Sequence, residues 1–256
     1  MNVIGVSCTS FSTRPPMEVL REVSRDFAHW EIFSELEHSV QTMDDPFFEA
    51  AADSGMSFSL HTSISDTDIA ALSPRMREAS VMEILTELEC AASMDIDTVT
   101  VHPGLVCLAV SQGTRDRSIA AARESCRLID RAAHEFRIEN VCIENMPDFG
   151  FMLGIRAEEL DAIVDGTELG ITFDIGHANT ACQIDAMIDT FGDRIANIHI
   201  HDNHGKDDEH LTIGDGTIDF KHVLGRLSNY KGRYIIESRN LESAVESQKR
   251  LREMLC

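Results

Sequence analysis

Short apolar runs recur along this chain at intervals that leave room for a helix between successive runs. The runs read as β-strands, and most are continuous apolar segments rather than clean alternations of apolar and polar residues. Continuous apolar strands are typical of a parallel sheet that is buried on both faces. Eight strands are predicted, at residues 2–7, 29–34, 57–61, 97–102, 140–144, 170–174, 195–200 and 233–237.

Between the later strands, apolar residues recur at spacings of three and four, which predicts amphipathic helices. Ser73 and Pro74 predict the start of the first helix, since serine caps helix N-termini and proline is tolerated at the first helical position. Gly192 predicts the end of another helix. The helical patterns run through residues 81–92, 119–133, 160–164, 184–191 and 223–227, and from Asn240 to the C-terminus.

The alternation of strands and helices predicts one α/β domain. Eight strand–helix units, with no composition break and no low-complexity segment, favour a single (β/α)₈ TIM barrel over residues 1–256. A barrel of this kind typically needs about 250 residues. The alternative is a doubly wound open sheet, which requires a glycine-rich turn after the first strand. The turn here, SCTSFSTRPP, contains no glycine.

Composition and charge restrict the molecules that the protein is expected to bind and the compartment in which it is expected to occur. The 44 acidic and 22 basic residues give a net charge of −22, which disfavours nucleic acid because its binding comes largely from cationic contacts to phosphates. No apolar stretch approaches the roughly 20 residues of a membrane span, and the N-terminus MNVIGVSC reads as a strand rather than a signal peptide. Cys90, Cys126 and Cys142 sit among apolar neighbours, which predicts reduced, buried thiols in a cytoplasmic protein.

Histidines and carboxylates stand at the ends of the predicted strands. In a TIM barrel the strand ends gather at one rim, where active sites are built. Carboxylates and imidazoles that converge from several strands are typical ligands of a divalent metal ion. The predicted rim residues are His61, His102, Glu144, Asp174, His177, His199 and Glu237, joined by Asp208 and His210 from the loop after the seventh strand.

Some of these residues also have a purely structural interpretation. Asp174 is well placed to cap a following helix, which would leave His177 as a surface residue. For Glu144 and Glu237 the functional interpretation is favoured more clearly. Both end apolar strands, where a buried carboxylate without a partner is costly.

The segment after the seventh strand offers two pairs of candidates. His199 and His201 share one face of the strand, and we expect His199 to be the ligand and His201 its hydrogen-bonded neighbour. Asp208 and His210 lie in a polar loop, where solvated charge is the alternative to metal binding.

Two polar residues near the rim are candidates for contact with a substrate. Glu35 follows the second strand, and Lys206 lies in the loop after the seventh strand, where its amine can meet a phosphate or a hydroxyl. A solvated surface position is the alternative for both residues.

These residues lie in segments that resemble a known family. HTSISD, TVHPG, CIEN, FDIGHAN, IHIHDNHGKDDEH, LTIGDGTIDF and IIESR are similar to the motifs of the xylose isomerase-like TIM barrels. That superfamily includes sugar isomerases and epimerases and the class II AP endonucleases. The resemblance covers essentially the whole chain. It implies a divalent cation as cofactor, zinc, manganese, cobalt or magnesium, with one to three ions per chain.

The two branches of this family imply different ligand sets. In the isomerase and epimerase branch one ion is held at the positions that match Glu144, Asp174, His199 and Glu237, and the residue that matches His177 lies near the substrate. In the endonuclease branch three zinc ions use those positions and five more. The additional positions match His61, His102, His177, Asp208 and His210, and all of them carry suitable residues here.

The rim loops separate the two branches. The endonucleases carry loops with aromatic, apolar and basic residues that penetrate DNA, whereas the loop after His61 reads TSISDTDIAAL, without an aromatic or basic residue. The epimerases carry an arginine soon after the histidine of the seventh strand. Here that stretch reads DNHGK, so Asn203 or Lys206 has to take the place of the arginine.

The predicted function is therefore a metal-dependent isomerase or epimerase of a small sugar or sugar phosphate. In this interpretation Glu144 and Glu237 transfer the substrate proton through a metal-stabilised enediolate. Two alternatives stay open. One is a phosphodiesterase of the AP endonuclease type with a two- or three-metal site, and the other is a non-catalytic barrel that binds a metal or a ligand. The sequence also leaves the oligomeric state open.

Overall fold

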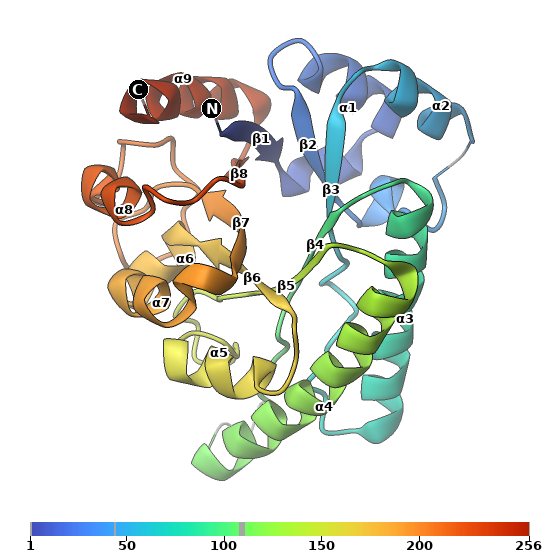
Figure 1. Cartoon of the computed structure of the whole chain (residues 1–256), viewed down its shortest axis with the longest axis vertical. Coiled ribbons are helices and arrows are strands. Elements are labelled where there is room, and N and C mark those ends of the chain that lie inside the picture. Colours follow the sequence, from blue (N-terminus) through green and yellow to red (C-terminus); the bar gives the residue numbers. More distant parts are fainter. Residues whose placement is uncertain (1, 44, 108–110, 256) are drawn as a thin grey trace.

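Eight parallel strands form a closed barrel in the computed structural model, which describes residues 2–43, 45–107 and 111–255. Each strand pairs with the next along the chain, and β8 closes the barrel against β1 (Figure 1). All eight predicted strands are confirmed, to within one residue at either end. They are β1 (Val3–Ser7), β2 (His29–Phe33), β3 (Ser57–His61), β4 (Thr98–Val101), β5 (Asn140–Glu144), β6 (Gly170–Asp174), β7 (Ile195–Ile200) and β8 (Arg233–Glu237).

Helices connect the strands and surround the barrel (Figure 1). The predicted helices correspond to α3 (Pro74–Ser93), α4 (Gln112–Phe136), α5 (Ala157–Val164), α7 (Ile184–Phe191), α8 (Phe220–Arg226) and α9 (Leu241–Leu255). Three further helices were not predicted from the sequence. They are α1 (Pro16–Val23), α2 (Asp45–Asp53) and the short α6 (Ile175–Thr180). The 3₁₀ turns are η1 (Thr9–Thr13), η2 (Leu36–His38) and η3 (Gly192–Arg194).

The observed helix ends can be compared with the capping and stop residues predicted from the sequence. Pro74 is the first residue of α3, as predicted, but the hydroxyl of Ser73 makes no capping hydrogen bond. A reciprocal cap opens α4 instead, where Ser111 and Thr114 bond each other's backbone N–H groups. Helix α7 ends at Phe191, and the following Gly192 continues directly into η3.

Polar side chains occupy part of the barrel interior, which differs from the prediction of continuous apolar strands. Glu31 of β2 accepts hydrogen bonds from Ser59 of β3 at 2.9 Å and from Asn197 of β7 at 3.0 Å, while Thr100 of β4 bonds Thr172 of β6 at 2.8 Å. Strands that are not neighbours can form such bonds only across the interior. Because these hydrogen bonds pair many of the buried polar atoms, the interior tolerates them beneath the rim.

The register of the strands brings the candidate residues to one rim. Asp174 at the end of β6 pairs with His199 of β7, and Glu237 at the end of β8 pairs with Ser7 at the end of β1. Since all strands run in the same direction, their carboxyl ends open on the same side.

Two predictions drawn from composition concern the burial of the cysteines and the presence of membrane-spanning helices. Cys126 and Cys142 are buried as predicted, whereas Cys90 on α3 is only half-buried. Throughout residues 2–43, 45–107 and 111–255, the helices are too short or too polar to cross a membrane.

Candidate metal centre

Four strand-end residues meet at the carboxyl rim of the barrel. We call Glu144, Asp174, His199 and Glu237 the central group. His199 Nδ1 lies 2.8 Å from Glu144 Oε1, 3.2 Å from Glu237 Oε1 and 3.9 Å from Asp174 Oδ2. Three of these side chains are fully buried, and Glu237 keeps 12% of its side chain exposed. The structure therefore brings together the four residues that the sequence pattern places at the ends of strands five to eight.

Asp174 combines two roles that the sequence presented as alternatives. Its Oδ1 accepts a hydrogen bond from the backbone N–H of His177 at 2.6 Å, which caps α6. Its Oδ2 is buried without a hydrogen-bond partner among the described residues and lies toward His199. The cap thus holds the carboxylate while leaving one oxygen for the central group. His177 is 5% exposed, so its interpretation as a surface residue is wrong.

Glu144 also belongs to a second group, which we call the β4 group, with His61 and His102. Its Oε2 lies 3.3 Å from His61 Nε2 and 3.0 Å from His102 Nε2, while its Oε1 contacts the central group. His61 ends β3 and His102 follows β4. One carboxylate is therefore placed between two sets of imidazoles.

A third set, the loop group, consists of His177, His201, Asp208 and His210. Asp208 lies 3.4 Å from His177 Nε2, 3.4 Å from His201 Nε2 and 2.9 Å from His210 Nε2. The pair in the β7–α8 loop is therefore not merely solvated charge. His201, expected only as a hydrogen-bonded neighbour of the site, is itself one of the converging side chains.

The protons of several histidines are fixed by acceptors behind the site. His61 Nδ1 lies 2.9 Å from the carbonyl of Thr62, and His177 Nδ1 lies 2.9 Å from the carbonyl of Asn145. A carbonyl oxygen can only accept, so each Nδ1 carries a proton and each Nε2 faces the site. Metal-binding histidines generally have this arrangement, which fixes the tautomer and the ring orientation.

Glu31 plays the corresponding part for His199 and was missed in the sequence. His199 Nε2 lies 2.7 Å from Glu31 Oε1, so Nε2 carries the proton and Nδ1 faces the central group. Glu31 has no solvent exposure and stands in the middle of β2. The signal was available, because a carboxylate inside the strand-like run HWEIF requires a buried partner.

The charges of the central group are strongly coupled. Burial by itself raises the pKa of Glu144, but the nearby His199 and the hydrogen bonds from histidines lower this pKa well below its usual range. Burial opposes a charge on His199, but Glu31, Glu237 and Glu144 raise its pKa well above the usual value. The carboxylates at the rim therefore create a strong demand for positive charge, which protons or a cation can meet.

The loop group has the same electrostatic character. Burial opposes ionisation of Asp208, yet the surrounding His177 and its hydrogen bond hold the pKa of this carboxyl well below the usual range. The pKa of His177 is raised well above its usual value, against the effect of burial, by Asp174 and Asp208.

The residues present fit a divalent metal ion. Their donors are imidazole nitrogens and carboxylate oxygens, the ligands found in zinc, manganese and cobalt sites. Buried atoms without a hydrogen-bond partner among the described residues include Asp174 Oδ2, His201 Nε2 and Asp208 Oδ1, and all three point into these groups. A cation would satisfy atoms that the protein leaves unpaired.

Of the three residues predicted to contact substrate, His177 belongs to the loop group, whereas Glu35 and Lys206 belong to none of the three groups. Glu35 Oε1 accepts hydrogen bonds from the backbone N–H groups of Ile64 and Ser65, both at 2.8 Å, and so supports the loop after β3. Lys206 is exposed in the β7–α8 loop. Their contact with a substrate stays a prediction.

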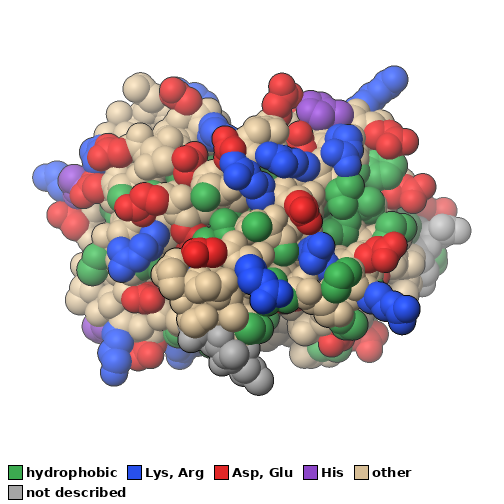
Figure 2. All heavy atoms as spheres, turned by 90° about the horizontal axis from the view of Figure 1, so that it is seen from below, with side chains coloured by type: hydrophobic (Ala, Val, Ile, Leu, Met, Phe, Trp, Pro, Cys, Tyr) green, Lys and Arg blue, Asp and Glu red, His purple; other side chains and the backbone are tan. Residues whose placement is uncertain are grey.

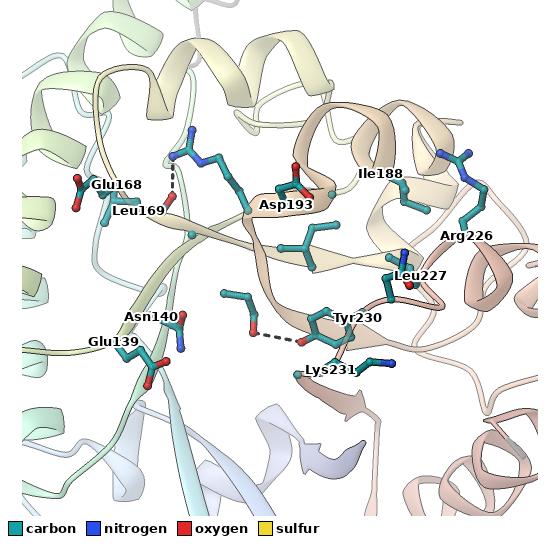
Figure 3. Close-up of a pocket in the computed structure, with 17 residues that line it drawn as sticks. Glu139, Asn140, Glu168, Leu169, Ile188, Asp193, Arg226, Leu227, Tyr230 and Lys231 are labelled. Atoms are coloured by element: carbon teal, nitrogen blue, oxygen red, sulfur yellow. Dashed lines mark hydrogen bonds between the residues drawn. The ribbon is translucent and has the colours of Figure 1, made fainter. Parts of the chain in front are cut away.

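A hollow of 680 Å³ lies at the opposite end of the barrel (Figure 3). It is lined by the first residues of β5, β6 and β7 and by the segment before β8, where Tyr230 donates a hydrogen bond to the carbonyl of Ala196 at 3.2 Å. None of the predicted site residues lines it. The strand starts of TIM barrels serve stability rather than catalysis, so we place the candidate site at the other rim.

An eight-stranded parallel barrel with carboxylates and imidazoles at its carboxyl rim defines the class of the protein as a TIM barrel with a candidate metal centre. A family model described as the xylose isomerase-like TIM barrel matches residues 25–254. The chain belongs to this family, as its motifs suggested.

Individual proteins are also similar to this chain. An uncharacterized protein of Methanocaldococcus jannaschii is 35% identical over 266 aligned positions, which cover 98% of this chain and 88% of the relative. A crystal structure of a D-tagatose 3-epimerase-like protein is 31% identical, with a TM-score of 0.89 over 99% of this chain and 97% of the other. Endonuclease IV from Thermus thermophilus shares the fold, with a TM-score of 0.72 and 22% identity over 99% of this chain and 98% of the other.

Proposed function

We propose that this protein is a divalent-metal-dependent isomerase or epimerase of a small sugar or sugar phosphate. The observation that carries the proposal is the central group, in which His199 Nδ1 and three carboxylates converge at the rim. The similarity to the D-tagatose 3-epimerase-like protein supports the same class of reaction.

In this proposal Glu144 and Glu237 transfer the proton on the carbon next to the substrate carbonyl. Glu237 is partly exposed, and its Oε1 and Oε2 lie 3.2 Å from His199 Nδ1 and 3.7 Å from His210 Nδ1. Glu144 is buried and contacts histidines through both oxygens. A metal ion held by the central group supplies Lewis-acid polarisation of the carbonyl. Glu237 is therefore the better placed of the two to exchange a proton with a substrate.

Lys206 is the proposed contact for a phosphate or a distal hydroxyl of the substrate. It is exposed in the β7–α8 loop, which also carries Asp208 and His210. A lysine meets a phosphate as a point charge, so its position need not be tightly set.

The surface supports a small substrate over nucleic acid. The chain carries a net charge of −22. Acidic and basic side chains are interspersed over the face in Figure 2. The loop after β3 contains Asp66 and Asp68 and no basic residue. DNA binding depends on the opposite charge.

A phosphodiesterase of the AP endonuclease type is the second candidate, and a specific observation favours it. The β4 group and the loop group are both assembled beside the central group, which gives ligands for two or three ions. The fold shared with endonuclease IV agrees with this candidate without selecting it.

The test is a turnover screen on a panel of sugars and sugar phosphates with Mn²⁺, Co²⁺, Mg²⁺ or Zn²⁺, run beside cleavage of an abasic DNA duplex. We expect isomerisation or epimerisation of at least one sugar, and no cleavage of the duplex. Glu237→Gln is the inactive control, and Glu242→Gln, on the outer helix α9, is the matched control that keeps activity. Cleavage of abasic DNA without sugar turnover would select the phosphodiesterase, and inactivity in both arms would favour the non-catalytic barrel.

A further inference from the structure

A chain of polar contacts runs through the barrel interior from the strand starts to the central group. His29, the first residue of β2, has no solvent exposure. Its Nδ1 lies 2.8 Å from Ser57 Oγ, and its Nε2 lies 3.0 Å from Ser59 Oγ. Ser59 Oγ donates to Glu31 Oε2 at 2.9 Å, and Glu31 Oε1 lies 2.7 Å from His199 Nε2. Four contacts therefore connect the base of the barrel with a candidate ligand at its rim.

The register of β2 and β3 explains why these side chains meet. His29 pairs with Ser57, and Glu31 pairs with Ser59. Residues two apart on a strand point to the same face, and Glu31 reaches Asn197 of β7 across the interior. His29 therefore points inward as well, and the two serines of β3 stand beside the two side chains of β2.

The chemistry of the acceptors fixes the direction of every proton in this chain. Glu31 is ionised, because the charge and hydrogen bond of His199 lower its pKa to about 2 against the effect of burial. An ionised carboxylate can only accept, so the one proton of the Ser59 hydroxyl points to Glu31. Ser59 Oγ must then accept from His29, which places the imidazole proton on Nε2. Nδ1 keeps a lone pair that accepts from Ser57.

His29 is held in the neutral form that this pattern requires. Burial and, to a smaller extent, the nearby Arg233 lower its pKa to about 4, whereas Glu31 and Asp97 have the opposite, weaker effect. The ring is also held by shape. A Cβ atom built on Gly5 of β1 would lie 2.6 Å from His29 Cδ2, so the ring packs directly against the backbone of β1.

The two serines differ in their access to water. Ser57 is exposed and lines a hollow of 510 Å³ at the strand starts, together with Asp97 and Arg233. Ser59 has no solvent exposure. Water can therefore replace the Ser57 hydroxyl as a donor to His29, whereas nothing replaces Ser59 in the interior.

We infer that His29 is a positioning residue for the candidate ligand His199 and acts through Ser59 and Glu31. By donating to Ser59, it keeps the serine proton on Glu31 Oε2 and leaves Oε1 to face His199 Nε2. His199 Nδ1 then points into the central group. The inference rests on the cation site of the proposed function, but it does not depend on which substrate or reaction that site serves.

The first test is long-range ¹H–¹⁵N NMR of the imidazoles in the metal-free protein at pH 7, with the His29 signals assigned by their loss in His29→Gln. We expect His29 to be neutral and to carry its proton on Nε2. A proton on Nδ1, or on both nitrogens, would overturn the inference.

The second test measures zinc affinity by competition with a chelating dye, for the ion that is lost in His199→Ala. His29→Ala and Ser59→Ala should each weaken this ion by about 3–10-fold, less than the loss of a direct partner of a ligand. Ser57→Ala should bind like wild type, and His29→Gln, which keeps an N–H donor, should recover part of the affinity. His134→Ala is the matched control, because His134 is an exposed histidine of the outer helix α4.

A double-mutant cycle separates positioning from a general loss of stability. In the Glu31→Gln background, His29→Ala should cause little further loss of zinc affinity, because its effect passes through Glu31. Additive losses, or wild-type affinity in both His29→Ala and Ser59→Ala, would overturn the inference and leave the proposed function standing. Wild-type protein without zinc at the central group would overturn both. Circular dichroism of each variant checks that the barrel is intact.

Discussion

Glu31 is a single buried carboxylate that orients one of the candidate ligands at this rim. It faces His199 Nε2 at 2.7 Å and is itself held by Ser59 of the neighbouring β3 and by Asn197 across the barrel interior. Burial raises its pKa, but the charge and hydrogen bond of His199 lower the pKa to about 2, so the group stays ionised. An ionised acceptor behind an imidazole increases the basicity of the ligand and fixes its orientation.

Replacing Glu31 by glutamine should therefore weaken metal binding without removing a ligand. We expect Glu31→Gln to reduce the affinity of the central group by about 10–100-fold, the usual cost of losing such a partner. The measurement is a competition titration with a chelating dye. Glu35→Gln is the control, because Glu35 holds the β3–α3 loop and does not contact His199. Unchanged affinity in Glu31→Gln would show that this contact does not orient the ligand.

The residues of the central group should divide into two kinds of effect. Glu237→Gln should reduce exchange of the substrate proton with solvent by about 10²–10⁴-fold, since it removes a proton carrier while the fold stays intact. Asp174→Asn and His199→Ala should first weaken metal binding, so that high metal concentration partly restores their activity. Glu144→Gln should show both effects, because Glu144 contacts histidines of two groups.

The measurements are solvent deuterium incorporation into the substrate and turnover as a function of metal concentration. Near-normal proton exchange in both Glu144→Gln and Glu237→Gln would remove this pair as proton carriers. A metal-hydroxide mechanism of the phosphodiesterase type would then gain support.

At the scale of elements, helix α3 is tied to the β3–α3 loop by a buried carboxylate. Glu87 is 1% exposed and accepts hydrogen bonds from the backbone N–H and the hydroxyl of Ser63, at 3.1–3.3 Å. Burial raises the pKa of Glu87 to about 7, against the smaller effect of hydrogen bonds from Ser34 and Ser63. In the unfolded chain this pKa returns to about 4.5.

The sign of the pH effect follows from this raised pKa. The stability that neutral Glu87 contributes is fully present below about pH 4.5 and is lost as the pH rises through about 7. Relative to Glu87→Gln, the wild-type free energy of unfolding should therefore fall over this range, by at most about 3 kcal/mol at 1.36 kcal/mol per pH unit. Urea unfolding of both proteins at several pH values, with chelator present, measures the difference. Parallel pH profiles would contradict it.

The β7–α8 loop depends on another buried carboxylate. Asp202 accepts four backbone hydrogen bonds, from Asn203, Gly214, Gly216 and Ile218, at 2.9–3.2 Å. These donors lie on both sides of the loop segment that carries Asp208 and His210. One side chain thus closes the base of the loop from which two candidate ligands extend.

Asp202→Asn should loosen this loop, because an amide nitrogen cannot accept from the backbone donors. We expect a loss of about 3 kcal/mol or more in the free energy of unfolding, since hydrogen bonds to charged groups each contribute about 1.5–3 kcal/mol. Metal binding by the loop group should weaken more than metal binding by the central group. Asp207→Asn, an exposed change in the same loop, is the control. Thermal unfolding and metal titration provide both readouts.

At the scale of the whole molecule, metal binding should raise the stability of the barrel. The three groups join residues from β3 to β8, and the unfolded chain has no such sites. A ligand at 1,000 times its Kd adds about 4 kcal/mol for each site. For a domain of this size 1 kcal/mol shifts Tm by about 2–4 °C, so we expect a rise of about 10 °C or more with zinc. Calorimetry with zinc and with chelator measures it, and equal Tm values would contradict metal binding.

Much of the barrel and of the rim could be predicted from the sequence. Eight apolar runs marked the strands, and Glu144, Asp174, His199 and Glu237 were placed at their ends. The helices α1 and α2 were missed, although they are no shorter than the predicted α5, α7 and α8. The polar interior was missed because a buried serine or threonine looks like a surface residue until its partner on another strand is known.

The sequence by itself determined the closed parallel barrel and the rim at which the ligands gather. Both follow from local patterns, because the regular alternation of strands and helices makes the strands parallel and brings their carboxyl ends to one side. Only the tertiary structure decided which atoms face one another. Glu31 meets His199 across the interior, and Asp208 meets His177 and His201 because the β7–α8 loop folds back over the rim. The first contact joins residues that lie far apart along the chain, and the others depend on the course of one loop. No local sequence pattern determines which of these residues come into contact.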